Sequence, residues 1–357
     1  MENPVTDSAI PKSVRSLRDL VDRGLATPPA HLPITQGGTT YSMAQEVRWL
    51  DDGHFAVGRW DGSLGVFEFE TAPLAGPLIS VAVNSPEIGG VRSISPLPGG
   101  ALATSNNESS LTLWSSDTGA WSGLRVRAVV DHDPTLGPAA TGVWAGTSLV
   151  TGHVNGYLAL WSYADTLRFE RAVDVRNAHP VNPFGDHTVE DVVTVTDDIV
   201  VAGAEDGYLT FLHVPSATIR SQTVFNPQAQ RGINALAVSG DRLLVANCAV
   251  GPQDHNLWYF VIDRTTWHPT LVDRANLVID RTRPQVFDFD VAWGTHAGEE
   301  CWFAATEEGA LWMGTVTPTA IQPGGYQQLS GPIGAALNTR GDRLAMVAYD
   351  LYQFVTG

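Results

Sequence analysis

Histidines and carboxylates stand close together at several points of this chain, and these residue types bind metals or carry protons. The groups are His132 with Asp131 and Asp133, His187 with Glu190 and Asp191, and the pair Asp288 and Asp290. A zinc site needs three or four N, O or S ligands, and a calcium site needs six or more oxygens. No local spacing forms an HExxH, EF-hand or GxSxG motif. Chemistry at these residues would require a fold that brings separate loops together.

The elements that would carry such loops are strands joined by tight turns. Three segments show the pattern most clearly: GHFAVGRWDGSLGVFEF from Gly53, SLVTGHVNGYLALW from Ser148 and DIVVAGAEDGYLTFL from Asp198. In each segment a polar turn residue is followed directly by Gly, and an apolar residue stands six positions after the turn residue. These pairs are Asp61 with Phe67, Asn155 with Trp161, and Asp206 with Leu212. A fixed offset predicts a repeat, and one hairpin cannot cover its own apolar face. Stacked copies are therefore expected.

Seven such units can be marked by the short apolar run that opens each one. These runs begin near Val47, Val91, Gly142, Val189, Ile233, Phe287 and Ile333. The intervals of about 44 to 54 residues fit a four-stranded propeller blade with short insertions. The sequence predicts an all-β protein, a single seven-bladed β-propeller over residues 31–357.

The two ends of the chain carry separate predictions. Residues 1–12 are polar and are expected to form a disordered tail, and residues 13–30 a short helix and a linker. The last unit ends at Gly357 without a fourth strand of its own. We expect the extended segment 32–36 to supply that strand, which would close the ring and cover an exposed edge.

The composition narrows the class of partner and the compartment. The net charge is −17 and Lys12 is the only lysine, which disfavours binding to nucleic acid or to an anionic membrane. Cys248 and Cys301 lack metal-type spacing, so we expect buried thiols, and the N-terminus has no signal-peptide core. These features favour a cytoplasmic protein. The replacement of Lys by Arg favours a bacterial, GC-rich source.

At these residues the chain resembles the WD-repeat β-propeller family. Trp ends the strand-like runs 111–114 and 158–161, although Ser115 and Ser162 stand where the family has Asp. The resemblance implies a structural hydrogen-bonded set of His, Ser or Thr, turn Asp and Trp. The fourth unit comes nearest, with His187 and Asp206. The turn residues given this structural role are Asp61, Asn155, His187 and Asp206.

Loops before the inner strands and turns after the second strands are expected on one face, around the channel mouth. Trp, Tyr and Arg tend to dominate binding energy because they bury large areas and carry a polar group. The predicted partner-binding residues are Arg59, Trp60, Asn107, His153, Glu205, Arg231 and Tyr349. The alternative for Trp60 is packing against the neighbouring blade.

Three functions remain open from the sequence. The leading one is a non-catalytic scaffold whose loop face binds a protein or peptide. A hydrolase or lyase with a His, Asp or Glu site at the channel mouth, with or without a metal, is the second. A small-ligand sensor is the third. We assign no catalytic residue, metal ligand or cofactor from the sequence.

Overall fold

The computed structural model describes most of the chain after its N-terminal segment. The described residues are 32–33, 44–59, 62–69, 79–82, 90–176, 186–228, 231–251, 253–329, 336–347 and 350–355. The predicted tail (1–12) and the predicted helix and linker (13–30) lie outside them. The described chain is nearly all antiparallel strand, with two short 3-10 helices, η2 (Trp121–Gly123) and η3 (Pro134–Leu136). This agrees with the predicted all-β class.

The first four sheets are four-stranded meanders, paired in sequence order. The first contains β2 (Ala44–Trp49), β3 (His54–Arg59), β4 (Ser63–Glu68) and β5 (Ile79–Ala82). The second contains β6 (Ser93–Leu97), β7 (Ala101–Ser105), β8 (Ser110–Ser115) and β9 (Arg125–Asp131). The third contains β10 (Ala139–Ala145), β11 (Ser148–His153), β12 (Tyr157–Tyr163) and β13 (Leu167–Asp174). The fourth contains β14 (Val189–Thr196), β15 (Ile199–Ala204), β16 (Tyr208–His213) and β17 (Thr218–Val224).

The next eight strands are two meanders that hydrogen bonds join into one sheet. One contains β18 (Ile233–Ser239), β19 (Arg242–Val250), β20 (Leu257–Ile262) and β21 (Pro269–Ala275). The other contains β22 (Gln285–His296), β23 (Glu299–Thr306), β24 (Ala310–Thr317) and β25 (Ala320–Gln328). The long strand β19 runs past its own hairpin, and its last three residues pair with β22. The predicted count of seven blades takes these two meanders as separate blades and stays a prediction.

The last sheet joins the two ends of the described chain, as the sequence predicted. It contains β26 (Ala336–Arg340), β27 (Arg343–Val347) and β28 (Asp350–Val355), with β1 (Leu32–Pro33) on its outer edge. Leu32 pairs with Leu351 and Pro33 with Asp350, in antiparallel register. The early strand thus supplies the fourth strand that the last unit lacks.

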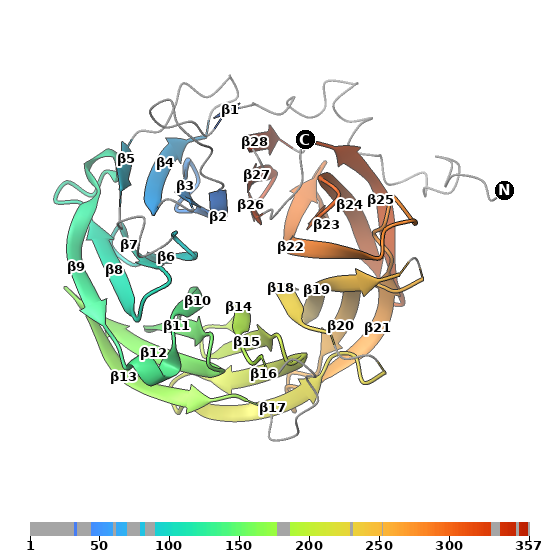
Figure 1. The fold of residues 1–357 in the computed structure, drawn as a ribbon, viewed down its shortest axis with the longest axis horizontal. Helices are drawn as coiled ribbons and strands as arrows, with labels where there is room; N and C mark the ends of the chain where they lie inside the picture. Colours follow the sequence, from blue (N-terminus) through green and yellow to red (C-terminus); the bar gives the residue numbers. More distant parts are fainter. Residues whose placement is uncertain are drawn as a thin grey trace.

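The sheets follow one another around a ring (Figure 1). In each four-stranded meander the first strand lies toward the centre of the ring, and the fourth lies at its rim. Turns between second and third strands use glycine at positive φ, as at Gly156 (78°) and Gly207 (80°). This left-handed conformation is open to glycine and strained for most other residues. It explains why the polar-Gly turn repeats in the sequence.

Glycines near the end of the second strands let neighbouring sheets pack closely. A Cβ atom at Gly58 would lie 2.5 Å from Val91, and one at Gly152 would lie 2.5 Å from Val189. Both neighbours belong to the segment that opens the next sheet. Apolar clusters fill the space between successive sheets, with Trp161 fully buried in one of them. The core is therefore distributed around the ring between sheets.

Candidate interaction surface on the loop face

The turns between second and third strands and the loops before first strands share one face of the ring, which we call the loop face. They share it because antiparallel strands return the chain to the same end of each sheet. A backbone hydrogen bond of 2.8 Å from Glu205 N to Thr188 O ties the turn after β15 to the loop before β14. Residues from these two segments therefore act on a common surface.

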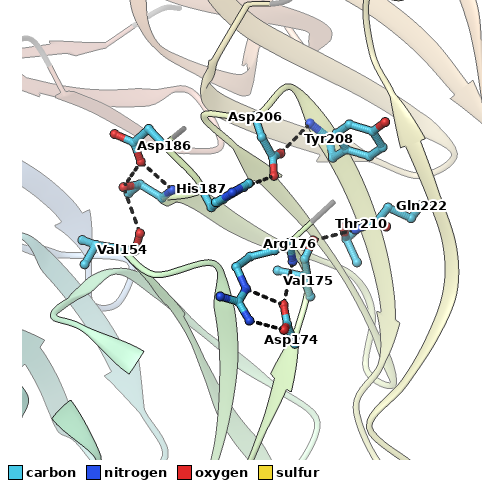
Figure 2. A network of polar contacts seen from close by, with 11 residues as sticks. Val154, Asp174, Val175, Arg176, Asp186, His187, Asp206, Tyr208, Thr210 and Gln222 are labelled. Carbon is cyan, nitrogen blue, oxygen red and sulfur yellow. Dashed lines mark hydrogen bonds and ion pairs between the residues drawn. The ribbon is translucent and has the colours of Figure 1, made fainter. Parts of the chain in front are cut away.

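A polar network fixes this part of the loop face (Figure 2). His187 Nδ1 lies 2.9 Å from Asp206 Oδ2, and Asp206 Oδ1 accepts a hydrogen bond from Tyr208 N. Asp186 accepts hydrogen bonds from the backbone N and the hydroxyl of Thr188. Asp206 keeps only 3 % of its area exposed. The structure thus brings His187 and Asp206 together, in a contact that holds the loop against the turn.

Beside this contact, an exposed arginine is held by its neighbours. Arg176 Nε donates to Asp174 Oδ1 at 3.0 Å, and Arg176 Nη2 donates to Tyr157 Oη at 2.9 Å. The guanidinium carbon lies 4.9 Å from the centroid of the Tyr157 ring. Figure 2 shows the Arg176–Asp174 pair below His187. Arginine and tyrosine are already ordered here, which lowers the entropy lost if a partner binds them.

Three carboxylates, Asp186, Glu190 and Glu205, form an acidic triad on the loop face. Burial, followed by the charges of Glu190, Asp186 and Asp206, raises the pKa of Glu205 to about 7. Burial also raises the pKa of Glu190, with Arg92 opposing the shift. The Glu205 carboxylate lies so close to Gly232 that a Cβ there would clash with it. The negative charges of the acidic triad are therefore held close together, because the backbone at Gly232 limits the movement of the Glu205 carboxylate.

Further charged residues converge from first strands on different sides of the ring. Glu46 accepts hydrogen bonds from Arg48 Nε and Nη2, at 3.1 and 2.8 Å. Asp191 accepts from Leu236 N, and Asp290 accepts from the first strand of the last sheet. Burial raises the pKa of Asp191, and Arg48 opposes that shift. Each aspartate thus links its sheet to the next one through a backbone N–H, while Arg48 supplies the opposite charge.

Three of the residues predicted to bind a partner lie on the loop face. Asn107 is exposed in the turn after β7, and Glu205 and Arg231 are half-buried. Arg231 Nη2 lies 3.4 Å from Asp254 Oδ2. Of the predicted residues, those outside the described part of the chain are Trp60, Asp61 and Tyr349.

Two other predicted partner-binding residues are buried. Arg59 keeps 6 % of its area exposed, and His153 keeps none. Since neither can form a broad contact with a partner in this conformation, we leave both out of the proposed surface. The turn residue Asn155 is exposed and donates to Thr135 O at 2.9 Å.

His153 belongs to a buried hydrogen-bonded chain. Trp161 Nε1 donates to Thr151 Oγ1, and Thr151 Oγ1 lies 2.9 Å from His153 Nε2. His153 Nδ1 lies 2.9 Å from the carbonyl of Gly137, which can only accept. The proton therefore sits on Nδ1, and Thr151 donates to Nε2. Burial lowers the pKa of His153 to about 4, so the ring is neutral at pH 7.

A fixed spacing in the sequence accompanies this hydrogen-bonded set. Trp161 follows its acceptor Thr151 by ten residues, and Trp114 follows Thr104 by the same interval, with its own hydrogen bond of 3.0 Å. A Thr ten residues before a Trp marks the hairpins in which strands two and three are joined through side chains.

Histidines of the described residues make pairwise contacts with another histidine or with a carboxylate. Among the described residues, no group of three or more His, Cys, Asp or Glu side chains is arranged to hold a metal ion. The rings of His132 and His153 meet edge to face, with their centroids 4.8 Å apart. His187 contacts Asp206 instead. In the part of the chain that the structure describes, no helix has the length and hydrophobicity to span a membrane.

Comparison with known proteins identifies the fold. No protein-family model and no curated protein matches the sequence. The structure is similar to the WD40 domain of Neurospora crassa Pan2, with TM-score 0.62 and 11 % identity, covering 88 % of this chain and 89 % of that one. It is similar to the β-propeller domain of Myceliophteria thermophila Cps50 (Swd1), with TM-score 0.63 and 16 % identity, covering 92 % and 100 %.

A third similar structure is a chain of the mitotic checkpoint complex. Its TM-score is 0.68 at 12 % identity, and the match covers 100 % of this chain and 97 % of that one. At such low identities the likeness speaks for the fold alone. The Trp-ending strands, the Asp-Gly turns and the ring of antiparallel meanders agree with it, and the protein therefore has the fold of a WD40-like β-propeller.

Proposed function

We propose that this protein is a non-catalytic interaction scaffold whose loop face binds a basic segment of a partner protein. WD40-like propellers serve generally in protein interaction, and one of the similar structures belongs to a complex, the mitotic checkpoint complex. Rigid sheets that present many loops suit this use. The observation that carries the proposal is the acidic triad of Asp186, Glu190 and Glu205.

The triad favours a cation because its carboxylates repel one another in a partly desolvated place. The pKa of Glu205, raised to about 7 by burial and by its acidic neighbours, shows that its negative charge is poorly compensated. A Lys, an Arg or an N-terminal ammonium placed beside Glu205 would lower that pKa and recover the lost electrostatic energy. Asn107 and the Tyr157–Arg176 pair provide further polar and aromatic contacts on the same face.

The experiment is capture of partners from native lysate on the full-length protein, followed by mass spectrometry. A stoichiometric partner should be recovered by the native protein and lost on Glu205→Gln. It should be retained on Glu299→Gln, which removes an exposed carboxylate at the start of β23. Binding should weaken as salt rises, since partly exposed charges are screened. Retention of the partner by Glu205→Gln would contradict the use of the triad.

The alternative is an enzyme, because a carboxyl with a pKa near 7 also suits general acid–base catalysis. It predicts a different outcome in the same experiment. Glu205→Gln would abolish turnover of a substrate while partner capture stayed unchanged. Elemental analysis of the purified protein would then show whether a metal takes part.

A further inference from the structure

The opposite face of the ring, formed by the turns between first and second and between third and fourth strands, contains two adjoining clefts. One has a volume of about 600 Å³ and runs between β15–β17 and the turn that precedes β21. The other, of about 430 Å³, lies between the turns that follow β10 and β14. Thr196 lines both, so the two clefts adjoin at this residue. Together they cross three sheets, and their sizes match those of ligand sites.

Trp267 stands at one end of this cleft in an uncommon backbone conformation. Its φ is 59°, in the left-handed region that bulky residues rarely adopt. The turn is held by Asp263, whose backbone carbonyl accepts from Trp267 N at 2.7 Å and whose side chain accepts from Thr265 N. Ser221 donates to the Trp267 carbonyl. Backbone strain of this kind collects where a side chain must be presented in one direction.

Trp267 is half-buried. It packs against the core cluster that contains Ile199 and Phe260, and it also lines the cleft. The far end of the cleft is also aromatic. Trp144 is half-buried there and meets Tyr163 edge to face, with ring centroids 6.3 Å apart. A tryptophan side chain thus lines each end of the cleft.

Between the two tryptophans the cleft is acidic. Asp197 and Asp198 are exposed in the turn after β14. Among the described residues, neither carboxylate makes an ion pair or a side-chain hydrogen bond. Arg220 is exposed on the outer strand β17 and places a positive charge at the rim end of the larger cleft. The lining therefore carries two carboxylates toward the centre of the ring and Arg220 toward the rim. Arg264, which is not part of the lining, lies over Trp267 with its guanidinium carbon 5.8 Å from the ring centroid.

We propose that this cleft is a second binding surface, for an extended segment of a partner protein that carries a basic side chain between apolar ones. The basic side chain would pair with Asp197 and Asp198, and the apolar ones would lie against Trp144 and Trp267. Arg220 would take an acidic side chain of the same segment, which fixes the direction in which the segment lies. The proposal does not depend on the loop face.

The test uses the full-length protein and fluorescent short peptides, in pools that share a fixed central Arg, Lys, Ala or Glu. In fluorescence anisotropy the Arg and Lys pools should bind about tenfold more tightly than the Glu pool, because like charges are rejected at an acidic surface. Asp197→Asn combined with Asp198→Asn should remove this preference. Glu299→Gln, which removes an exposed carboxylate at the start of β23, should leave it unchanged.

Two further variants test the rest of the surface. Trp267→Ala should weaken binding of every pool, and Trp267→Phe, which keeps an aromatic ring, should restore part of it. Arg220→Glu should reverse the preference at the position of the acidic side chain. Far-UV circular dichroism on each variant checks that the fold is retained.

The outcomes separate this cleft from the loop face. If the preference for basic pools survives the double aspartate variant and is lost on Glu205→Gln, the selection belongs to the loop face and the cleft proposal is wrong. The proposed function would then stand. If the native protein binds no pool, the cleft proposal is overturned as well, while capture of a partner through Glu205 would still decide the proposed function.

Discussion

Replacing Glu205 by Gln should stabilise the folded protein, by an amount that grows with pH. Burial, followed by the charges of Glu190, Asp186 and Asp206, raises the pKa of Glu205 from 4.5 to about 7. The folded state therefore favours the protonated carboxyl, and the carboxylate opposes folding. This penalty is absent below pH 4.5, builds up between pH 4.5 and 7, and is complete above pH 7.

The size of the effect follows from the shift. Each pKa unit corresponds to about 1.4 kcal/mol, so the shift of Glu205 gives an upper limit of about 3 kcal/mol. The residue is only half-buried, and screening by solvent lowers the expected gain to about 1–3 kcal/mol above pH 7. Below pH 4.5 the native protein and Glu205→Gln should be equally stable.

The assay is urea unfolding of both proteins at pH 4 and pH 8, with the free energy of unfolding extrapolated to water. Glu299→Gln serves as the control, because it removes an exposed carboxylate and reports the general effect of lowering the net charge. A Glu205→Gln protein that is no more stable than the native one at pH 8, or whose gain is the same at both pH values, would refute the argument.

Three further substitutions test the interior. Thr151→Val should destabilise by roughly 1–3 kcal/mol in urea unfolding, since Trp161 and His153 lose a buried hydrogen-bond partner, whereas Thr151→Ser should stay near native. Asp288→Val should stabilise, more at pH 8 than at pH 5, because burial raises the pKa of this carboxyl and neither oxygen has a hydrogen-bond partner in the described structure. Gly152→Ala should lower the thermal midpoint through overpacking that costs about 1–3 kcal/mol, because its Cβ would meet the next sheet. An unchanged midpoint would show that the sheets can separate without cost.

The ring could be predicted from the sequence because its signals are local. The turn glycines Gly156 and Gly207 adopt the positive φ that their place in the repeat implies. Two of the predicted unit starts, Val189 and Ile233, are the first residues of β14 and β18. The predicted pairing of the early extended segment with the last unit is confirmed at Leu32 and Pro33, since β1 pairs with β28.

The surfaces could be predicted less well, because side-chain direction depends on tertiary contacts. His153 follows a tight glycine at a strand end, where the sequence suggested exposure, yet the Gly137 carbonyl and Thr151 enclose it. The sequence does not reveal the place of Arg48, because Asp191 and Asp290, two of its three carboxylate neighbours, come from strands on other sides of the ring. The cleft depends on a left-handed Trp267 and on turns of three sheets, none of which a local pattern reveals.

The contributions of Glu205 and His153 to the pH dependence of the free energy of unfolding should largely cancel. His153 has a pKa lowered by burial from 6.5 to about 4, so its contribution is complete above pH 6.5 and is lost as the pH falls toward 4. The Glu205 carboxylate acts in the opposite sense over nearly the same range, because its penalty disappears as the pH falls from 7 to 4.5. Each shift corresponds to at most about 3 kcal/mol.

The native free energy of unfolding should therefore change little between pH 5 and 7 on account of these two groups. In Glu205→Gln the contribution of His153 is no longer offset. The free energy of unfolding of this variant should therefore fall, relative to that of the native protein, by about 1–3 kcal/mol as the pH drops from 7 to 5. Adding His153→Asn should remove that slope, whatever it does to the absolute stability. Since only the slope is compared, lost packing at position 153 does not confuse the result. A slope that persists in the double variant would place the pH-dependent group elsewhere in the ring.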